Sequence, residues 1–424
     1  MIRVTATADQ PISAASAREA GFATPAFGYI PGWVFRGALA AAWIRTFGEP
    51  RHGTTHRDAF IAMFEGDARF SSLLPRDAAF EPLSAMACKY PNTTECLSFA
   101  IDRAFSDDAQ ASHQCAHCHG SLEPLKGQLR GAVTSRRAHV ALDEHGRALA
   151  GKLYSRESIP KKTVLHGMIT GTNEWLLESP PDLIRVGGQR STSGRCTLHV
   201  KSEPTTPPRV LDNMRLVLRC DAPTIVIDHF GRPQLDLDTQ EIAARIGVAK
   251  HDVVLRQRFA RPAVIGGWHT ASARPKPKEL AIAAGSTFVY ELRRPVGASE
   301  LTALTDAGLG ERKREGFGWI TVNPAPWTNL VIDDAQSVTV VTDWPALREA
   351  SPEGAKWCVA QLRERLTEIE MGKLDATDHT SRVSNTVRFN DLSLLQREEL
   401  QELLAGNDVQ TIRHAIAALR KANA

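Results

Sequence analysis

The sequence predicts an α+β fold, and three observations support this fold class. Short runs with alternating apolar residues, such as residues 2–7, are typical of half-buried strands and occur along most of the chain. Apolar residues at helical spacing dominate only after about residue 327. A strand, a helical segment and a Gly-rich loop also occur twice in the same order. Gly187 of the first loop follows the strand start Thr163 by 24 residues, and Gly310 of the second loop follows the strand start Thr287 by 23 residues. This recurrence predicts an internally duplicated domain, with a period near 123 residues.

The predicted elements of the first half follow one another in a simple order. Residues 33–47 are rich in Ala and Leu and follow a Pro-Gly turn, which predicts a helix. Residues 136–151 predict a β-hairpin, because two strand-like runs flank the turn residues 143–146. A further strand is expected within residues 152–171, and the first Gly-rich segment spans residues 185–200.

The second half repeats this order before the pattern changes. Two strands, a short helix and the second Gly-rich loop are expected within residues 214–228, 281–294, 301–308 and 308–318, respectively. The loop continues into another strand. Residues 344–369 and 392–422 then show apolar residues at i, i+3 and i+4 spacing, which predicts a separate helical module with an ordinary packing role.

Length and composition exclude several classes of protein. The 424 residues suffice for two to four domains of roughly 100–200 residues each. Hydrophobic residues make up 42% and charged residues 23%, as in ordinary globular proteins, which argues against a disordered or fibrous chain. No stretch approaches the roughly 20 apolar residues that cross a bilayer, and the N-terminal residues lack the apolar region of a signal peptide. We therefore expect a cytoplasmic protein with no membrane partner.

The distribution of charge is more informative than the net charge. The net charge of +3, from 51 basic and 48 acidic residues, gives no indication of a nucleic-acid partner. Residues 255–278, however, contain six basic residues and no acidic one, and residues 120–165 contain nine basic residues against four acidic ones. Such clusters are typical electrostatic footprints for phosphate, so the sequence favours RNA binding.

The second Gly-rich loop combines four glycines with the basic residues Arg312, Lys313 and Arg314. Glycine permits positive φ and close backbone approach, and clustered amides with cationic side chains suit a polyanion. The loop matches neither the phosphate-binding GxxxxGK[ST] pattern nor a dinucleotide fingerprint. A surface turn without a ligand is the alternative, but a second such loop at an equivalent point of the duplication favours a functional role.

Four of the seven cysteines fall within 31 residues: Cys88, Cys96, Cys115 and Cys118. The CxxC pair with two further thiolates predicts a structural, tetrahedral Zn²⁺ site in an insertion at about residues 82–125. Because the spacing is looser than in a standard zinc ribbon, three histidines are alternatives to Cys96 as the fourth ligand: His113, His117 and His119. No HxE motif of a deaminase precedes the CxxC pair, and a redox CxxC would require a βαβ context that is absent.

Several segments are informative in combination: residues 30–39 (IPGWVFRGAL), residues 187–191 (GGQRS) and the second Gly-rich loop. Together they resemble the RAMP superfamily of CRISPR-associated proteins. More narrowly, Cys88, the CAHC motif, residues 153–155 and residues 283–288 are similar to the handle-capping, Cas5-like subunit (Csx10) of type III-D effectors or its type VII relative. The resemblance covers roughly residues 1–325, and the last hundred residues carry no familiar motif.

The resemblance implies two tandem ferredoxin-like (RRM-like) domains, over residues 1–205 with the zinc insertion and over residues 206–326, followed by a helical region over residues 327–424. It also implies a non-catalytic subunit that caps the 5′ handle of a CRISPR RNA (crRNA) in an effector ribonucleoprotein of antiviral defence. The partners implied are the crRNA 5′ handle, Cas7-like subunits and, as a further candidate, Cas10 or another effector subunit, with target RNA contacted indirectly.

The residues expected to contact RNA come from the first helix, the hairpin, both Gly-rich loops and a further Gly-containing segment: Arg36, Arg136, Arg137, His139, Gly187, Gly188, Arg190, Arg195, Trp268, His269, Gly310, Arg312, Lys313, Arg314, Gly316, Phe317 and Gly318. An open sheet face and its loops can hold single-stranded RNA through backbone contacts, aromatic stacking and arginine planes. Trp319, after the second loop, is expected to be a core residue more than a stacking one.

Catalysis is not predicted. The candidates for a metal-bound acid or a general base are Asp102, Asp143, His139 and His269, and their spacing pairs none of them with a partner. The alternative function is a metal-independent endoribonuclease of the same superfamily that processes repeat RNA, with His139 or His269 as the base. A zinc-dependent hydrolase unrelated to RNA is a third hypothesis.

Overall fold

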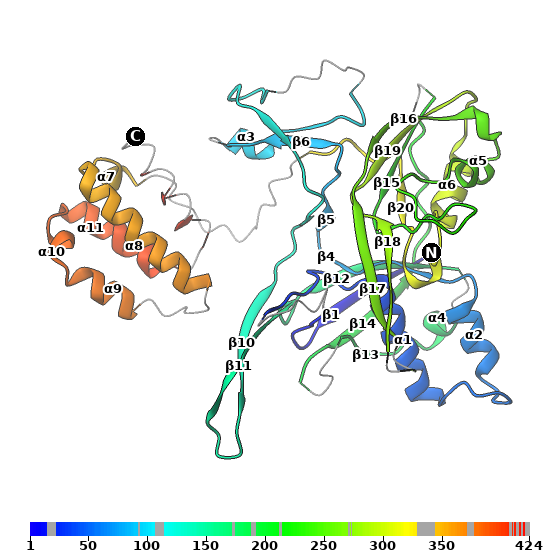
Figure 1. Cartoon of the computed structure of the whole chain (residues 1–424), viewed down its shortest axis with the longest axis horizontal. Coiled ribbons are helices and arrows are strands. Elements are labelled where there is room, and N and C mark those ends of the chain that lie inside the picture. The colour runs from blue at the N-terminus through cyan, green and yellow to red at the C-terminus, as the bar shows by residue number, and fades with distance from the viewer. Residues whose placement is uncertain are drawn as a thin grey trace. The chain divides into compact units, whose positions relative to one another are not determined.

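Strands and short helices alternate through most of the chain in the computed structural model, which confirms the predicted α+β fold class (Figure 1). The chain divides into two units, Met1–Ile332 and Asp333–Ala424, and each is described by itself. The structure describes all residues except 15–22, 92–93, 107–113, 172–173, 188–191, 212–213, 270–271, 273, 329–343, 371–376, 407–408, 410, 413–414, 417–418 and 420–424. Every residue expected to contact RNA or metal belongs to the first unit.

The first sheet is built around β1 (Ile2–Ala8), whose residues alternate as predicted. Val4 and Ala6 are buried in the core, whereas Arg3 and Thr5 lie on the opposite face. The strand order is β13-β14-β1-β12-β3, with β4 also beside β12, and neighbouring strands are antiparallel. The remaining strands are β3 (Arg69–Phe70), β4 (Leu74–Pro75), β12 (Val164–Thr170), β13 (Leu183–Arg185) and β14 (Arg195–Ser202).

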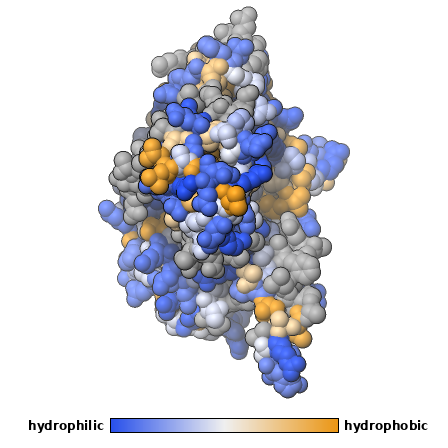
Figure 2. Space-filling view, turned by 90° about the vertical axis from the view of Figure 1, so that its left-hand side faces the viewer, coloured by the Kyte–Doolittle hydropathy of each residue, from blue (hydrophilic) through white to orange (hydrophobic). Residues whose placement is uncertain are grey.

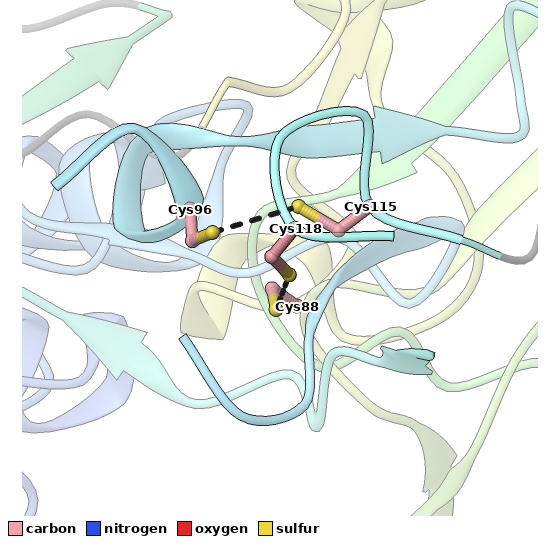
Figure 3. Close-up of side chains that lie close together, drawn as sticks. All are labelled: Cys88, Cys96, Cys115 and Cys118. Carbon is pink, nitrogen blue, oxygen red and sulfur yellow. Dashed lines mark hydrogen bonds between the residues drawn. The ribbon is translucent and has the colours of Figure 1, made fainter. Parts of the chain in front are cut away.

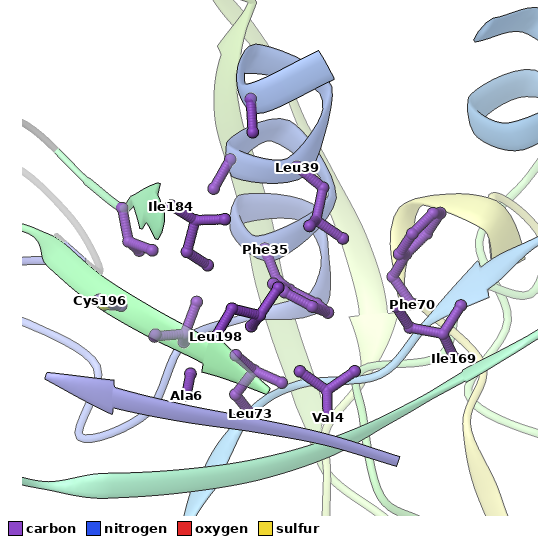
Figure 4. Packing of buried hydrophobic residues seen from close by; sticks show 14 of the residues in the cluster. Val4, Ala6, Phe35, Leu39, Phe70, Leu73, Ile169, Ile184, Cys196 and Leu198 are labelled. Carbon is purple, nitrogen blue, oxygen red and sulfur yellow. The ribbon is translucent and has the colours of Figure 1, made fainter. Parts of the chain in front are cut away.

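Helices cover one face of this sheet: α1 (Gly32–Phe47), α2 (Arg57–Glu65) and α4 (Glu174–Glu178). The predicted helix α1 is confirmed; it begins after Pro31 and ends before Gly48, whose φ of +84° is rare for residues with a side chain. Phe35 and Leu39 lie one turn apart on α1 and share the core with Val4 of β1 (Figure 4).

The second sheet has the antiparallel strand order β16-β19-β15-β20. Its elements are β15 (Arg215–Cys220), α5 (Thr239–Arg245), the 3₁₀ turn Lys250–Asp252, β16 (Val253–Phe259), β19 (Thr287–Leu292), α6 (Ala298–Ala307) and β20 (Ile320–Val322). Leu218, Phe288 and Leu304 belong to a core separate from the first one. The strands predicted within 214–228 and 281–294 and the predicted helix near 301–308 are therefore confirmed.

Two hairpins lie outside these sheets. In the first, β10 (Ser135–Leu142) pairs with β11 (Ala148–Ser158), and the parallel strand β2 (Ala23–Thr24) adds to β11. This confirms the predicted hairpin, whose turn is fixed by Asp143, because its Oδ1 accepts the N–H groups of His145 and Arg147 at 2.9 and 2.8 Å. Figure 1 shows that this hairpin extends far from the two sheets. The second hairpin pairs β17 (Pro262–His269) with β18 (Arg274–Ile282).

A small subdomain lies at the position of the predicted insertion. Strand β6 (Ala85–Cys88) lies between β7 (Ala100–Asp102) and β8 (Leu122–Pro124), beside the short helix α3 (Thr94–Ser98), and β5 (Ala79–Phe80) pairs with β9 (Leu129–Arg130) nearby in sequence. Asp102 accepts the Ser84 hydroxyl at 2.6 Å and the Trp327 N–H at 3.0 Å. Asp102 therefore fixes the chain after β20 to this subdomain.

The second unit consists of the helices α7 (Pro345–Arg348), α8 (Pro352–Glu370), α9 (Thr377–Ser384), α10 (Val387–Asn390) and α11 (Leu394–Ala405). Leu362, Phe389 and Leu403 belong to its core. A capping box starts α11, because Ser393 and Gln396 each accept the other's backbone N–H, at 3.3 and 3.0 Å. Of the helices that the structure describes, none combines the length and apolarity of a membrane span.

Candidate functional site

Four cysteine side chains converge in the insertion (Figure 3). Their sulfur atoms all lie within 4.8 Å of one another, with Cys88–Cys118 at 3.6 Å and Cys96–Cys115 at 3.8 Å. Four thiolates around a tetrahedral metal ion, at metal–sulfur distances of about 2.3 Å, have their sulfur atoms about 3.8 Å apart. The four cysteines are therefore arranged to hold a metal ion.

Backbone hydrogen bonds fix the turn that carries the CxxC pair. The N–H of His119 donates to the carbonyl of Cys115 at 2.9 Å, and the N–H of Cys115 donates to the carbonyl of Gly120 at 2.8 Å. The Gly120 N–H lowers the pKa of Cys118, but desolvation and the neighbouring thiols raise this pKa to about 12 overall. Four thiolates at this distance therefore require a cation.

Cys96, and none of the described histidines, completes the cluster. The His117 ring packs edge-on against Phe99, with ring centres 5.5 Å apart and planes at 87°. His113 lies outside the described residues. Of the alternative ligands left open by the spacing, His117 and His119 are thus less well placed than Cys96.

The second Gly-rich loop contains the 3₁₀ turn Lys313–Glu315, and carboxylates surround its cations. Each basic side chain of the loop forms an ion pair: Arg312 with Glu315 (2.8 Å) and Glu279 (2.9 Å), Lys313 with Glu241 (2.9 Å), and Arg314 with Glu65 (3.5 Å). The N–H of Gly310 donates to Glu241 at 2.8 Å. In this conformation, these groups have partners within the protein. The sequence suggested that they are presented together to a polyanion, and the structure does not show that arrangement.

The loop borders a groove of about 1510 Å³ that seven basic and seven acidic side chains line. Burial would raise the pKa of Glu315, but hydrogen bonds from Arg312 and Lys276 lower it to about 2, so its carboxylate stays charged at neutral pH. Because positive and negative side chains are equal in number, RNA phosphates would have to displace carboxylates to bind here.

The end of the loop packs on the start of α1. Phe317 is fully buried and stacks on Trp33, with ring centres 4.9 Å apart and planes at 16°. A Cβ on Gly32 would lie 2.4 Å from the Phe70 carbonyl and 2.8 Å from Gly316 Cα. The Phe317 ring is thus covered by protein and is not open to an RNA base, in contrast to the expectation from the sequence.

Two glycines of α1 provide a matched test of this close contact. We expect Gly32→Ala to destabilise the first unit by about 2 kcal/mol, because the added methyl group must push two backbone segments apart. Gly37→Ala should stabilise it by about 0.5–1 kcal/mol, because a Cβ at Gly37 meets no described atom within 4 Å and alanine favours a helix interior. Urea unfolding curves of both variants check this, and equal effects would contradict the contact.

Both Gly-rich loops approach another backbone segment in the same way. A Cβ on Gly187 (φ +78°) would lie 2.3 Å from the Ser13 carbonyl, and one on Gly310 (φ +80°) would lie 2.2 Å from the Ile225 carbonyl. A second contact also recurs, because the N–H groups of two later loop glycines donate to proline carbonyls: Gly194 to Pro11 (2.9 Å) and Gly318 to Pro223 (3.0 Å). In both contacts the two acceptors are 212 residues apart in the sequence.

One face of the β10–β11 hairpin combines two arginines with two stacked rings. The strand register places Arg137 opposite Arg156 and His139 opposite Tyr154, and the two rings stack at 5.2 Å and 16°. Among the described residues, neither arginine has an ion-pair partner. Like charges directly opposite each other are unfavourable, so this face favours an anionic ligand. Figure 2 shows that the protruding end of the hairpin, at the bottom of the view, is mainly hydrophilic.

Sequence reasoning missed two members of this face. Tyr154 and Arg156 were expected on a strand, but only the register of the hairpin shows that they face His139 and Arg137. Arg136 lies on the other face, where it pairs with Glu157 at 2.6 Å. The alternation of side chains along the two predicted strands was the signal that could have separated these faces.

Two other predicted residues have protein partners. Arg36 donates to the Phe64 carbonyl and to Glu65 at 2.6 Å, so its charge lies at the C-terminal end of α2. Arg195 lies at the start of β14 with its Nε 3.9 Å from a carboxylate oxygen of Asp9. Arg36 thus has a structural role, and Arg195 remains partly exposed.

The structure describes only some of the remaining residues that were expected to contact RNA. Gly188 and Arg190 lie outside the described residues. Trp268 and His269 end β17, where His269 lies opposite Arg274 of β18, but their side chains are outside the described part. Of the basic segment that the sequence singled out, only Arg274, Lys276 and Lys278 lie on β18 of this hairpin. Arg256 and Arg258 lie on β16, where they pair with Glu291 and Asp236.

Comparisons with known proteins give a family and several distant likenesses. The family described as "CRISPR-associated protein (Cas_Cmr3)" matches residues 101–323. No curated protein matches the chain.

Three solved structures illustrate the distant likenesses. A chain of the type III-B Cmr-beta complex bound to cognate target RNA and AMPPnP is 12% identical, with a TM-score of 0.38 over 68% of this chain and 86% of that chain. A RAMP protein binding different RNA substrates is 11% identical, with a TM-score of 0.32 over 76% and 98% of the two chains. The product of a Cas6-related gene from Pyrococcus furiosus is 10% identical, with a TM-score of 0.31 over 76% and 98%.

Proposed function

The chain belongs to the Cas_Cmr3 family of CRISPR-associated RAMP proteins, and from this membership we propose that it binds RNA as a non-catalytic subunit of a CRISPR effector ribonucleoprotein. The observation that carries the proposal is the hairpin face formed by Arg137, His139, Tyr154 and Arg156. Single-stranded RNA binds to cations that follow its backbone and to rings that stack on its bases, and this face supplies both.

We further propose that the RNA is the 5′ handle of a crRNA, which the subunit caps, as the Cas5-like motifs imply. Cas7-like subunits would then be its neighbours, with Cas10 or another effector subunit as a further partner and target RNA contacted indirectly. The type III-D and type VII assignments both accommodate this role, and the site of action would be the cytoplasm.

The two sheets support the proposal of tandem ferredoxin-like domains. In each sheet, a first strand (β1 or β15) lies centrally, and the strand before the helix that precedes the Gly-rich loop (β12 before α4, or β19 before α6) pairs with it. The final strand (β14 or β20) pairs with its other edge. The repeated glycine contacts of the two loops agree with this duplication. We propose domain boundaries near residues 205 and 326.

The Arg137→Ala/Arg156→Ala double variant tests the hairpin face. We expect its affinity for single-stranded repeat RNA to fall at least tenfold at low salt, because two unpaired cations are lost. The slope of log affinity against log salt should become shallower by roughly 1 to 1.5, since each phosphate contact contributes about 0.7. Fluorescence anisotropy over a salt series measures both quantities.

Arg136→Ala is the matched control for this experiment. Arg136 is on the same strand, but Glu157 already neutralises it on the opposite face. Its removal should change the salt slope by less than half as much as the double variant does. An equal loss of affinity in both proteins would show that RNA binding depends on the overall positive charge of the hairpin and not on this face.

The absence of catalysis remains part of the proposal, and the roles of two candidate acids support it. Asp102 binds Ser84 and the Trp327 backbone, and Asp143 closes the hairpin turn, so both carboxylates have structural partners. His139 stacks on Tyr154. A stacked ring suits base contact, although a general base on this face is the alternative that a cleavage assay must exclude.

We propose Zn²⁺ as the ion of the cysteine cluster. Four thiolate ligands and a closed tetrahedron are typical of structural zinc, whereas a catalytic zinc keeps one position open for water. The cluster also forms much of the small core of the subdomain, together with Met86 and Leu122. Zinc would therefore hold the insertion folded and would take no part in a reaction.

A further inference from the structure

A second, smaller pocket lies between the two sheets of the first unit, with a volume of about 250 Å³. On β12, Leu165 belongs to the first core, while the next residue, His166, lines the pocket. On β15, Leu218 belongs to the second core, while Arg219 lines the pocket. The pocket thus joins the faces of both sheets that lie opposite their helix-covered cores.

The lining combines flat apolar walls with a few polar groups. Phe80, Met168 and Trp319 supply apolar surface, and Arg219 lies 3.5 Å from Asp221 among the polar lining groups. Small-molecule sites usually have this composition, but drug-sized ligands need about 300–1,000 Å³. The volume here suits one ring system and little more.

Two lining residues contain buried polar atoms without a partner. The hydroxyl oxygen of Ser72 and the indole nitrogen of Trp319 have no hydrogen-bond partner among the described residues. Ser72 is only 7% exposed. A buried donor without a partner is unfavourable, so a ligand that supplies acceptors would be stabilised here. The guanidinium of Arg69 lies 4.4 Å from the Trp319 ring centre and holds the indole in place.

We propose that this pocket takes a single unstacked nucleobase of the bound RNA. A base has flat apolar faces for the walls, and its edges carry both acceptors for Ser72, Trp319 and Arg219 and donors for Asp221. A phosphate would be repelled by the Asp221 carboxylate, and a purely apolar ligand would leave the polar groups unpaired. The inference rests on the proposed RNA binding and adds to it a base-specific contact between the sheets.

Abasic scanning of the RNA, combined with filling of the pocket, tests this proposal. Single abasic sites are placed along a repeat-derived RNA, and the affinity of the full-length protein for each RNA is measured. In the wild type, one position should lose about tenfold in affinity, as expected for the loss of one stacked base. In Ala79→Leu, whose larger side chain occupies the pocket, the loss at that position should fall below twofold.

Two further variants keep the test conclusive. Ala303→Leu adds the same side chain to the charged groove and should leave the tenfold loss intact. Trp319→Phe keeps a ring but removes the unpaired N–H, so it should reduce the loss even if Ala79→Leu fails to fold. If RNA binds but no abasic position matters, or if the loss persists in the pocket variants, the pocket does not hold a base and the proposed function stands. If no RNA binds at all, both proposals are wrong.

Discussion

The Cys115→Ser variant is expected to lose its metal ion and the folded structure of the insertion. Three remaining thiolates cannot close the tetrahedron that the four sulfur atoms outline. The core of this subdomain consists largely of the cysteines themselves, with Met86 and Leu122, so few other contacts can replace the metal. Structural Zn²⁺ binding contributes about 10–16 kcal/mol in zinc-finger peptides, which makes this the largest effect that we expect from a single substitution.

Elemental analysis of the purified protein measures this effect directly. The wild type should contain one Zn²⁺ per chain, and Cys115→Ser should contain almost none and be cleaved by protease within residues 82–125. Cys358→Ala is the control, because Cys358 is also buried but belongs to the core of the helical unit. A wild-type protein that folds without metal, or a variant that retains it, would contradict the metal centre.

Replacing Arg69 with methionine is expected to destabilise the first unit by about 3 kcal/mol or more. The side chain is 5% exposed and donates to the carbonyls of Asp306 and Gly318, at 2.5 and 3.4 Å. These contacts connect β3 of the first sheet to the last turn of α6 and to Gly318, which lies just before β20 of the second sheet. Hydrogen bonds from a charged group contribute about 1.5–3 kcal/mol each. The Asp306 carbonyl would lose its charged donor, whereas the Gly318 carbonyl would keep the N–H of Leu309 at 3.1 Å. Burial lowers the pKa of Arg69 to about 10, so it stays charged at neutral pH.

Arg51→Met is the matched control for Arg69→Met. Arg51 also forms an ion pair, with Glu49 at 2.7 Å, but both side chains are largely exposed. Exposed pairs contribute about 0–1 kcal/mol, so the control should change the first thermal transition by a degree or two at most. If differential scanning calorimetry finds similar shifts for both variants, Arg69 does not hold the sheets together.

The local features of the chain could be predicted from the sequence. The helix α1 follows from its Ala and Leu content, and the hairpin turn follows from Asp143, because both depend on neighbouring residues. The cysteine cluster was found because a CxxC pair is itself a local motif. The helix α2 was missed, because its nine residues are a short segment in which helix propensity alone decides little.

The partners of the second Gly-rich loop could not be predicted, because they lie far away in the sequence. Arg314 pairs with Glu65, 249 residues earlier, and Lys313 pairs with Glu241, 72 residues earlier. A string of basic residues therefore suggested an open phosphate site, whereas the fold supplies the carboxylates that neutralise it. Phe317 is a similar case, since its stacking partner Trp33 belongs to the first helix.

The hairpin face lies between these two cases. Arg137 and His139 were candidates from local charge and residue type, and the turn at Asp143 fixes which residues face them. One step of register would have exchanged the two faces of the hairpin, so Arg156 and Tyr154 became visible only in the structure.

The central claim is that this subunit binds the 5′ handle of a crRNA without cleaving it. Two labelled RNAs, identical except that one lacks the handle, are incubated with the purified full-length protein, and affinity and length are measured for both. We predict at least tenfold tighter binding of the RNA with the handle and full recovery of both RNAs at their original length. Equal affinity for the two RNAs, or cleavage that His139→Ala abolishes, would contradict this account.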